Sequence, residues 1–236
     1  MSTERTRPII AIDGPAGAGK SIVARRLAAD LGFTFVDTGA IYRALAFVAR
    51  QRGVATDDAD ALGELASQLV AGRSLRFEFG GTGTKVYLEG TEITASLRTS
   101  DVGIAASLCS AHAEVRDAFL ALQRELGEVG GVVFEGRDIG TVVFPNADVK
   151  FFLTASPHVR AERRVVELQH KGENVSFNDT LNQVQRRDQL DSMRAVAPLR
   201  RAKDAAIIDS SSLSIDETVL LMSQCVRAFD FSSEEA

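Results

Sequence analysis

Residues 14–21 read GPAGAGKS and directly follow the short apolar run Ile9–Ile12. The spacing G-x-x-x-x-G-K-[ST] is that of a phosphate-binding loop, in which backbone N–H groups surround phosphate oxygens. In this context the apolar run is a buried strand, and residues 22–31 form a helix whose N-terminus adds a positive dipole at the phosphates. Because strand, loop and helix follow in the order that this motif needs, the sequence predicts an α/β fold built around a nucleoside triphosphate site.

Two side chains of this loop have defined chemistry. Lys20 can reach the β- and γ-phosphates of a nucleotide, and the Ser21 hydroxyl can ligate Mg²⁺. Glu135 ends a later apolar run, and it could act on the same ion through water, because Mg²⁺ often keeps much of its hydration shell. The sequence therefore predicts a magnesium–nucleotide site at this loop.

Apolar runs alternate with amphipathic helical segments along most of the chain. Beyond the first run, strands are expected at residues 33–36, 131–134, 149–153 and 206–208. Near-continuous β-branched and aromatic runs suit strands that are buried on both faces of a parallel sheet, and helices between them imply right-handed crossovers. We therefore expect a doubly wound α/β core with a five-stranded parallel sheet.

Two stretches break this rhythm. Residues 39–107 contain two helical segments and then two period-two segments around a glycine-rich turn, which predicts an inserted unit of helices and a small antiparallel sheet. Residues 156–186 are helical and charged, with an interruption at Lys171-Gly172, and predict a short helical lid. The core then consists of residues 1–38, 108–155 and 187–236.

Composition limits the other possibilities. The chain has 236 residues, 45% of them hydrophobic, and a net charge of -5, which argues against general nucleic-acid binding. Its two cysteines, Cys109 and Cys225, form no disulfide framework or zinc pattern, and no apolar run approaches the ~20 residues that span a membrane. We expect a cytoplasmic monomer whose partners are small molecules rather than nucleic acids or membranes.

Charged residues follow the predicted strands, where the ligand crevice of an α/β sheet lies. Arg43 ends the segment DTGAIYR after the second strand, and Arg137-Asp138 lies between two glycines after the third. Either feature could instead be solvated surface, but the position at the crevice favours a function.

Two further charged groups lie on helical segments. Arg160, Arg163 and Arg164 share one helical face, where like charges are unfavourable unless anions arrive. Arg187, Asp191 and Arg194 are spaced i, i+4 and i+7 along a second helix. From position alone, the first group could be a solvated face and the second an intrahelical ladder of ion pairs. Lysine, magnesium and mobile arginines together would suit phosphoryl transfer, which needs charge stabilisation and alignment.

The segments GPAGAGKS, DTGAIYR, EGRDIGTVVFP and RRDQLDSMRAVAPL together resemble bacterial cytidylate kinases over nearly the whole chain. The resemblance implies phosphorylation of CMP and dCMP by ATP with Mg²⁺, and it implies that residues 39–107 bind the acceptor. It implies ATP contacts at Gly14, Pro15, Ala16, Gly17, Ala18, Gly19, Lys20, Ser21 and Ile22. It implies CMP contacts at Thr38, Tyr42, Arg43, Ser107, Arg116, Arg137, Asp138, Arg187, Asp191 and Arg194.

The resemblance also implies individual roles. Thr38 and Arg43 approach the acceptor's sugar and phosphate, and Arg137 contacts that phosphate. Arg187 and Asp191 approach the pentose. The residues implied around cytosine are Ser107, Arg116, Asp138 and Arg194. The residues implied in catalysis are Lys20, Arg137, Arg160, Arg163 and Arg164, the last three around the donor phosphates.

One position departs from the family pattern. Ile22 stands where related kinases commonly carry a serine or threonine whose hydroxyl helps to hold the donor α-phosphate, so weaker donor binding is expected.

Other functions compete with this one. The nearest is a kinase of the same architecture acting on UMP or a sugar acid. A GTPase would need a guanine-reading N-K-x-D motif, which the sequence lacks. A non-enzymatic nucleotide-binding module is disfavoured because Lys20, Ser21 and Glu135 are all present.

Overall fold

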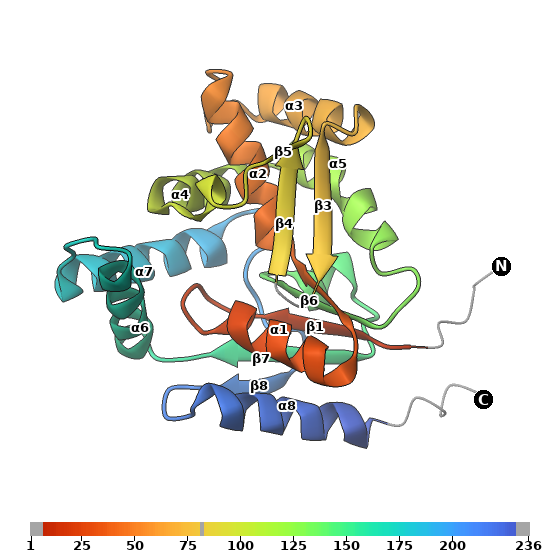
Figure 1. The fold of residues 1–236 in the computed structure, drawn as a ribbon, viewed down its shortest axis with the longest axis vertical. Helices are drawn as coiled ribbons and strands as arrows, with labels where there is room; N and C mark the ends of the chain where they lie inside the picture. The colour runs from red at the N-terminus through yellow and green to blue at the C-terminus, as the bar shows by residue number, and fades with distance from the viewer. Residues whose placement is uncertain (1–6, 81–82, 230–236) are drawn as a thin grey trace.

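The computed structural model describes residues 7–80 and 83–229 and contains the expected five-stranded parallel sheet (Figure 1). Its strands are β1 (Ile9–Asp13), β2 (Thr34–Asp37), β6 (Val132–Gly136), β7 (Val149–Thr154) and β8 (Ala206–Asp209). The order β2-β6-β1-β7-β8 places β1 at the centre. Because all the strand pairs are parallel, the carboxyl ends of the strands lie at one edge of the sheet, and the phosphate-binding loop follows the end of β1 there. Residues 1–6, at the start of the first part of the expected core, and residues 230–236, at the end of the last part, lie outside the described residues.

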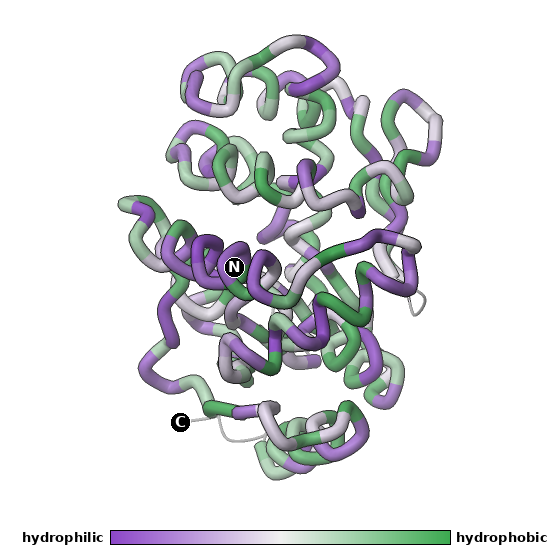
Figure 2. The backbone as a smooth tube through the Cα atoms, turned by 90° about the vertical axis from the view of Figure 1, so that its left-hand side faces the viewer, coloured by the Kyte–Doolittle hydropathy of each residue, from purple (hydrophilic) through white to green (hydrophobic). Residues whose placement is uncertain are grey.

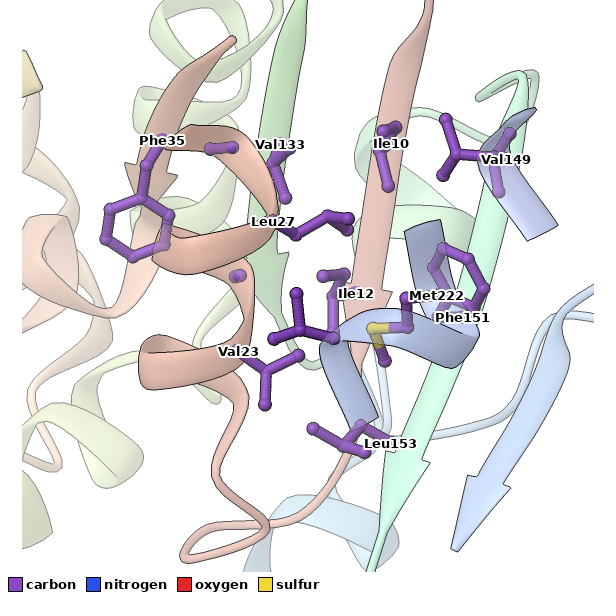
Figure 3. Packing of buried hydrophobic residues seen from close by; sticks show 14 of the residues in the cluster. Ile10, Ile12, Val23, Leu27, Phe35, Val133, Val149, Phe151, Leu153 and Met222 are labelled. Atoms are coloured by element: carbon purple, nitrogen blue, oxygen red, sulfur yellow. The ribbon is translucent and has the colours of Figure 1, made fainter. Parts of the chain in front are cut away.

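Two helices cover one face of this sheet. They are α1 (Lys20–Leu31) and α8 (Ile215–Ala228), which pack against each other and against alternate side chains of the strands. Figure 3 shows Leu27 of α1 and Met222 of α8 over Ile12 and Phe151, all buried. On the opposite face, Ala11 and Phe134 pack with Ile139 and other residues of a short π-helical turn, η2 (Ile139–Val143).

The inserted unit lies beyond the β2 edge of the sheet. Its helices are α2 (Thr38–Gln51), α3 (Ala59–Ala71) and α4 (Ser100–Cys109), with a 3₁₀ turn η1 (Ser96–Arg98), and the helix α5 (Ala113–Glu125) follows them. Its sheet consists of β3 (Leu75–Gly80), β4 (Gly83–Leu88) and β5 (Thr91–Glu92). The predicted hairpin is confirmed, with Phe77 opposite Val86, whereas β5 is too short for period two to indicate. Residues 81–82 of the predicted turn lie outside the described residues.

Helix α5 packs with the inserted unit. It follows residue 107, the expected end of the insertion, yet Val115 and Phe119 lie in the same apolar cluster as Leu45 of α2 and Leu62 of α3. The helix nevertheless leads into β6, so it connects the inserted unit to the sheet.

The lid segment consists of two helices. α6 (Pro157–His170) is capped at its start by the Ser156 side chain, and α7 (Phe177–Met193) by that of Ser176. The predicted interruption is present: α6 ends before Lys171, and Gly172 has a positive φ of 81°. Residue 186, the expected end of the lid, lies inside α7.

Most helices alternate green and purple in Figure 2, as expected for helices with one buried face. Within residues 7–80 and 83–229, no helix is both long and apolar enough to cross a membrane.

Candidate active site

The phosphate-binding loop joins the end of β1 to the start of α1, and its close turns need glycine. A Cβ atom on Gly14 would lie 1.9 Å from the backbone oxygen of Leu153, and Gly17 and Gly19 have φ values of 76° and 91°. Because β-carbons disfavour such positive φ values, glycine lets the backbone curl here without strain.

Lys20 lies buried at the first position of α1. Its Nζ donates a hydrogen bond of 2.8 Å to the Pro15 oxygen, across the loop. Burial, and then the positive charge of Arg137, lower the pKa of Lys20 to about 7. An anion bound in the loop would oppose both effects, because an opposite charge favours the ionised lysine.

Glu135, at the end of β6, links the donor loop to the start of α2. Its Oε1 accepts a hydrogen bond of 2.9 Å from Ser21 Oγ, and its backbone oxygen accepts one of 2.7 Å from Thr38 Oγ1. Oε2 is buried and has no hydrogen-bond partner among the described residues. Burial, and then the neighbouring Asp37 charge, raise the pKa of Glu135. These oxygens are of the kind that Mg²⁺ prefers.

Two arginines whose charges act on Lys20 form a cationic cluster: Arg137, directly after β6, and Arg187, on α7. Arg137 Nε donates a 2.7 Å hydrogen bond to Asp191 Oδ2. Burial would lower the pKa of Arg137, but the charge and hydrogen bond of Asp191, together with the charge of Glu135, raise it. Burial would likewise raise the pKa of Asp191, but the charges of Arg137 and Arg187 and the Arg137 hydrogen bond together bring it below its usual range. The pair therefore stays ionised.

Arg187 lies beside this pair and is not neutralised by it. Its Nε is buried without a hydrogen-bond partner in the described part of the chain. Burial, and then repulsion from Arg137, lower the pKa of Arg187 to about 10. Because Asp191 bonds to Arg137, the alternative of an intrahelical ladder of ion pairs along α7 is wrong.

Four residues from four parts of the chain form a second polar cluster. Asp138, directly after β6, forms a buried ion pair with Arg116 of α5, and its other oxygen lies 3.5 Å from Arg194. Arg194 also donates to the Ser110 hydroxyl at 3.2 Å, and Arg116 to the Ser110 backbone oxygen at 3.2 Å. Arg116, Asp138 and Arg194, which the resemblance implies around cytosine, are three members of this cluster. Ser107 is joined to the group through its backbone oxygen, which accepts a hydrogen bond of 3.1 Å from Ser110 Oγ.

Two predicted acceptor residues lie on α2. Arg43 forms a 2.6 Å ion pair with Asp37, the residue that caps this helix. Tyr42 is buried edge-on against Phe119, and the Arg116 guanidinium carbon lies 5.5 Å from its ring centroid. Tyr42 therefore supports the wall of the Asp138 cluster.

The structure does not gather the three lid arginines at one point. Arg160 is buried, with two hydrogen bonds of 2.9 and 2.6 Å to Asp188 of α7 and one of 3.1 Å to the Ala16 oxygen. Only Arg160 thus touches the phosphate-binding loop. Arg163 bonds to Ser210, after β8. Arg164 bonds to Glu167 and to the Ser100 hydroxyl. Helical spacing placed these residues on one face but could not indicate how far their long side chains diverge.

Sequence reasoning missed Asp13, at the end of β1. Its two buried carboxylate oxygens accept hydrogen bonds of 2.8 Å each from the backbone N–H groups of Ile139 and Gly140. These residues directly follow Arg137-Asp138, so Asp13 joins the donor-loop strand to the segment bearing both cationic clusters. Burial raises the pKa of Asp13 to about 6, and the two N–H groups partly oppose the shift. The sequence signal that could have identified Asp13 is its position as an acidic residue directly after the apolar run Ile9–Ile12.

Comparisons with known proteins show the family of this chain. A family model described as cytidylate kinase matches residues 10–228. A cytidylate kinase of Geobacter sp. (strain M21) is 45% identical over 93% of this chain and 92% of its own. One of Shouchella clausii (strain KSM-K16) is 47% identical over 89% and 92%, and one of Vibrio vulnificus (strain CMCP6) is 48% identical over 90% and 92%.

Proposed function

This chain belongs to the cytidylate kinase family, and from this premise we propose how its site performs the transfer of the γ-phosphoryl group from ATP to CMP or dCMP. The enzyme is a phosphotransferase whose acceptor is itself a phosphate group. Neither the family model nor these relatives favour UMP, the alternative acceptor.

The donor binds along residues 14–22 in this proposal. The N–H groups of the loop surround the β-phosphate, and Lys20 extends toward the bridging region between the β- and γ-phosphates. Arg160 is the lid arginine best placed to take part, because it already contacts Ala16 and needs only to exchange Asp188 for a phosphate oxygen. Arg163 and Arg164 would have to leave Ser210 and Ser100 to reach the same place.

The acceptor phosphate binds between Arg137 and Arg43, with Arg187 beside them toward the pentose. An oxygen of that phosphate attacks the γ-phosphorus, a new P–O bond forms, and the bond to the β–γ bridging oxygen breaks so that ADP leaves with the electron pair. The acceptor phosphate is already ionised near neutral pH, so the protein needs to align and neutralise charge rather than remove a proton. Closure of the lid would exclude water, which would otherwise take the phosphoryl group.

Mg²⁺ fits the oxygens on this site. Ser21 Oγ and the unpartnered Glu135 Oε2 would hold it, the carboxylate directly or through water. When bound, the ion neutralises charge on the donor phosphates.

The observation that carries the proposal is the meeting of Lys20, Arg137 and Arg187 in one buried region. Repulsion from Arg137 lowers the pKa of each of the other two, and Arg187 Nε has no partner within the described residues. Such a region is completed by phosphates. The test is to mix the enzyme with ATP, Mg²⁺ and CMP and to measure products by ³¹P NMR. CDP and ADP should form in equal amounts, whereas release of inorganic phosphate without CMP dependence would support a hydrolase instead.

We also propose that the enzyme acts as a monomer in the cytoplasm, where both of its nucleotides are available, with no nucleic-acid or membrane partner. The unpaired thiols of Cys109 and Cys225 suit a reducing compartment.

We expect Ile22→Thr to tighten ATP binding and to leave the KM for CMP nearly unchanged. Ile22 is 45% exposed on the first turn of α1, and nothing in the structure explains an isoleucine there. One added hydrogen bond is worth about 0.5–1.5 kcal/mol net, so the gain should be several-fold at most. Ile22→Val, which has the same shape without the hydroxyl, is the control. Equal ATP affinity in both variants would show that a hydroxyl at residue 22 is not used.

We expect Asp191→Ala and Arg187→Ala to reduce activity mainly through recognition of the sugar. Leaving a hydroxyl unpaired in a closed site costs roughly 1–3 kcal/mol. The measurement is kcat/KM for CMP, dCMP and arabinosyl-CMP, and the losses should differ among the three sugars. Because Asp191 bonds to Arg137, a uniform loss in Asp191→Ala would show that it acts by positioning the phosphate instead.

We expect Asp13→Asn to raise the KM for CMP by roughly tenfold, since one unpaired buried N–H costs about 1–3 kcal/mol, and to change the KM for ATP much less. With the pKa of Asp13 raised to about 6, the carboxylate gains a proton as the pH falls through 6 and loses one acceptor. Wild-type affinity for CMP should therefore weaken below pH 6, and Asp13→Asn should show less of this change. The control is Asp58→Asn, at the exposed cap of α3. Equal effects of both variants would contradict the role given to Asp13.

A further inference from the structure

A second cavity, of about 480 Å³, lies behind the segment that carries Arg137 and Asp138. Its walls come from η2, from β7 and from residues 198–204 between α7 and β8. Its wall on β7 is Lys150, whose neighbours Val149 and Phe151 lie in the apolar cluster under α1 and α8. Because successive side chains of a strand point to opposite faces, Lys150 lies on the other face of the sheet. Lys20, Arg137 and Arg187 do not line this cavity.

The charge of the lining is strongly positive. Four cations line the cavity, Lys150, Arg200, Arg201 and Lys203, with Asp204 as the only acidic residue. Lys150 is buried and forms a 2.6 Å ion pair with Asp204, whereas the other three cations are exposed and have no carboxylate partner in the lining. In the part of the chain that the structure describes, none of those three makes a hydrogen bond or an ion pair. A chain of net charge -5 thus keeps three unpaired cations around one hollow.

A neutral group in the same wall also has no partner. The Thr141 Oγ1 is buried and makes no hydrogen bond to any described residue, and Thr141 lines the cavity. A buried hydroxyl without a partner is unfavourable, and rotation of the Thr141 side chain toward the cavity would let it donate to an acceptor oxygen there. The unpartnered hydroxyl is independent of the three cations, and an anion with several acceptor oxygens would satisfy both.

We propose that this cavity binds a phosphate-bearing anion, at a site separate from the two nucleotide sites of the kinase. Arg200 and Arg201 offer planar guanidinium groups that bind phosphate oxygens in bidentate fashion, and Lys203 adds a point charge. The Thr141 hydroxyl donates to one further oxygen. The anion lies beside Gly140, whose N–H group Asp13 holds.

The experiment uses the full ¹⁵N-labelled chain with its catalytic site filled by CMP and a non-hydrolysable ATP analogue. Inorganic pyrophosphate is titrated while amide chemical shifts are recorded. Saturable shifts are expected at residues 140–142 and 200–204. Arg200→Gln/Arg201→Gln should weaken the apparent affinity by at least about tenfold, because two charge-assisted contacts are lost. Arg50→Gln/Arg52→Gln, which removes the same charge at the exposed end of α2, should bind as the wild type does.

The variants must first be shown to fold. Kinase activity without pyrophosphate and the melting temperature should be unchanged in Arg200→Gln/Arg201→Gln, and Lys203→Gln serves as a second variant. Absence of shifts at these residues, or equal weakening in both double variants, would overturn the proposal. A parallel titration with GDP identifies the source of the phosphate. Tighter binding of GDP than of pyrophosphate at the same residues supports a nucleotide ligand, and equal binding supports an inorganic one.

Discussion

Replacing Lys20 with alanine is expected to lower kcat for CMP phosphorylation by at least about two orders of magnitude, which corresponds to about 2.7 kcal/mol of transition-state stabilisation. The charge lies where the donor loop closes, with Nζ 2.8 Å from the Pro15 oxygen. In the ligand-free protein this charge is unfavourable, because burial and Arg137 lower the pKa of Lys20 to about 7. Its removal should therefore cost the fold little. Steady-state kinetics and a thermal melt measure the two effects separately.

Two variants sharpen this test. Lys20→Met keeps the length of the side chain without the charge and should lose as much activity as Lys20→Ala. Lys85→Ala, at an exposed position of β4, should keep wild-type kinetics. Near-normal turnover in Lys20→Met would contradict the role of the charge, whatever the stability of the variant.

Replacing Asp138 with alanine is expected to reduce activity on CMP far more than on UMP, so that the preference between them shrinks by at least about tenfold, or 1.4 kcal/mol. Cytosine presents an amino donor where uracil presents a carbonyl oxygen, and a carboxylate suits only the first. Asp138 is held between Arg116 and Arg194, which fix the position of its oxygens. Uracil would bring a second acceptor against them in a dry pocket.

The arginine pair makes a second variant necessary. Removing Asp138 leaves Arg116 and Arg194 buried without a counter-charge, which could destabilise the fold. Asp138→Asn keeps the shape, and its amide can donate to the uracil oxygen, so UMP should gain relative to CMP. The measurement is kcat/KM for both nucleotides on all three proteins. If both variants keep the full CMP preference, Arg116 and Arg194 determine base choice.

The fold was largely predictable from the sequence because its elements have strong local signals. The loop at residues 14–21 fixed the first strand and helix, and the buried strands are nearly continuous apolar runs, so all five strands are confirmed. The hairpin follows from period two in β3 and β4. Two elements were not predicted. The strand β5 has only two residues, too few to show an alternating pattern, and the π-helical turn η2 depends on hydrogen bonds to Asp13 of a strand distant in the sequence.

The candidate site was predictable in its residue types but not in its pairings. Spacing on α7 brought Arg187 and Asp191 to one stripe, yet Asp191 bonds to Arg137, which is 54 residues away. Ser110 rather than the Ser107 hydroxyl contacts the arginines, because α4 ends between them and turns the chain. Such choices depend on how distant elements approach, which no local pattern records. The roles given to these residues remain predictions for the variants described above.

Acceptor choice gives the most direct test of the proposed reaction. ADP release from ATP and Mg²⁺ is measured with CMP, dCMP, UMP, AMP and GMP, and kcat/KM is compared across the five. CMP and dCMP should be the best acceptors, at least about tenfold above UMP, with the two purine nucleotides far below because an unpaired polar group in the base pocket is costly. A kcat/KM for UMP, AMP or GMP equal to or above that for CMP would contradict cytosine recognition by Arg116, Asp138 and Arg194.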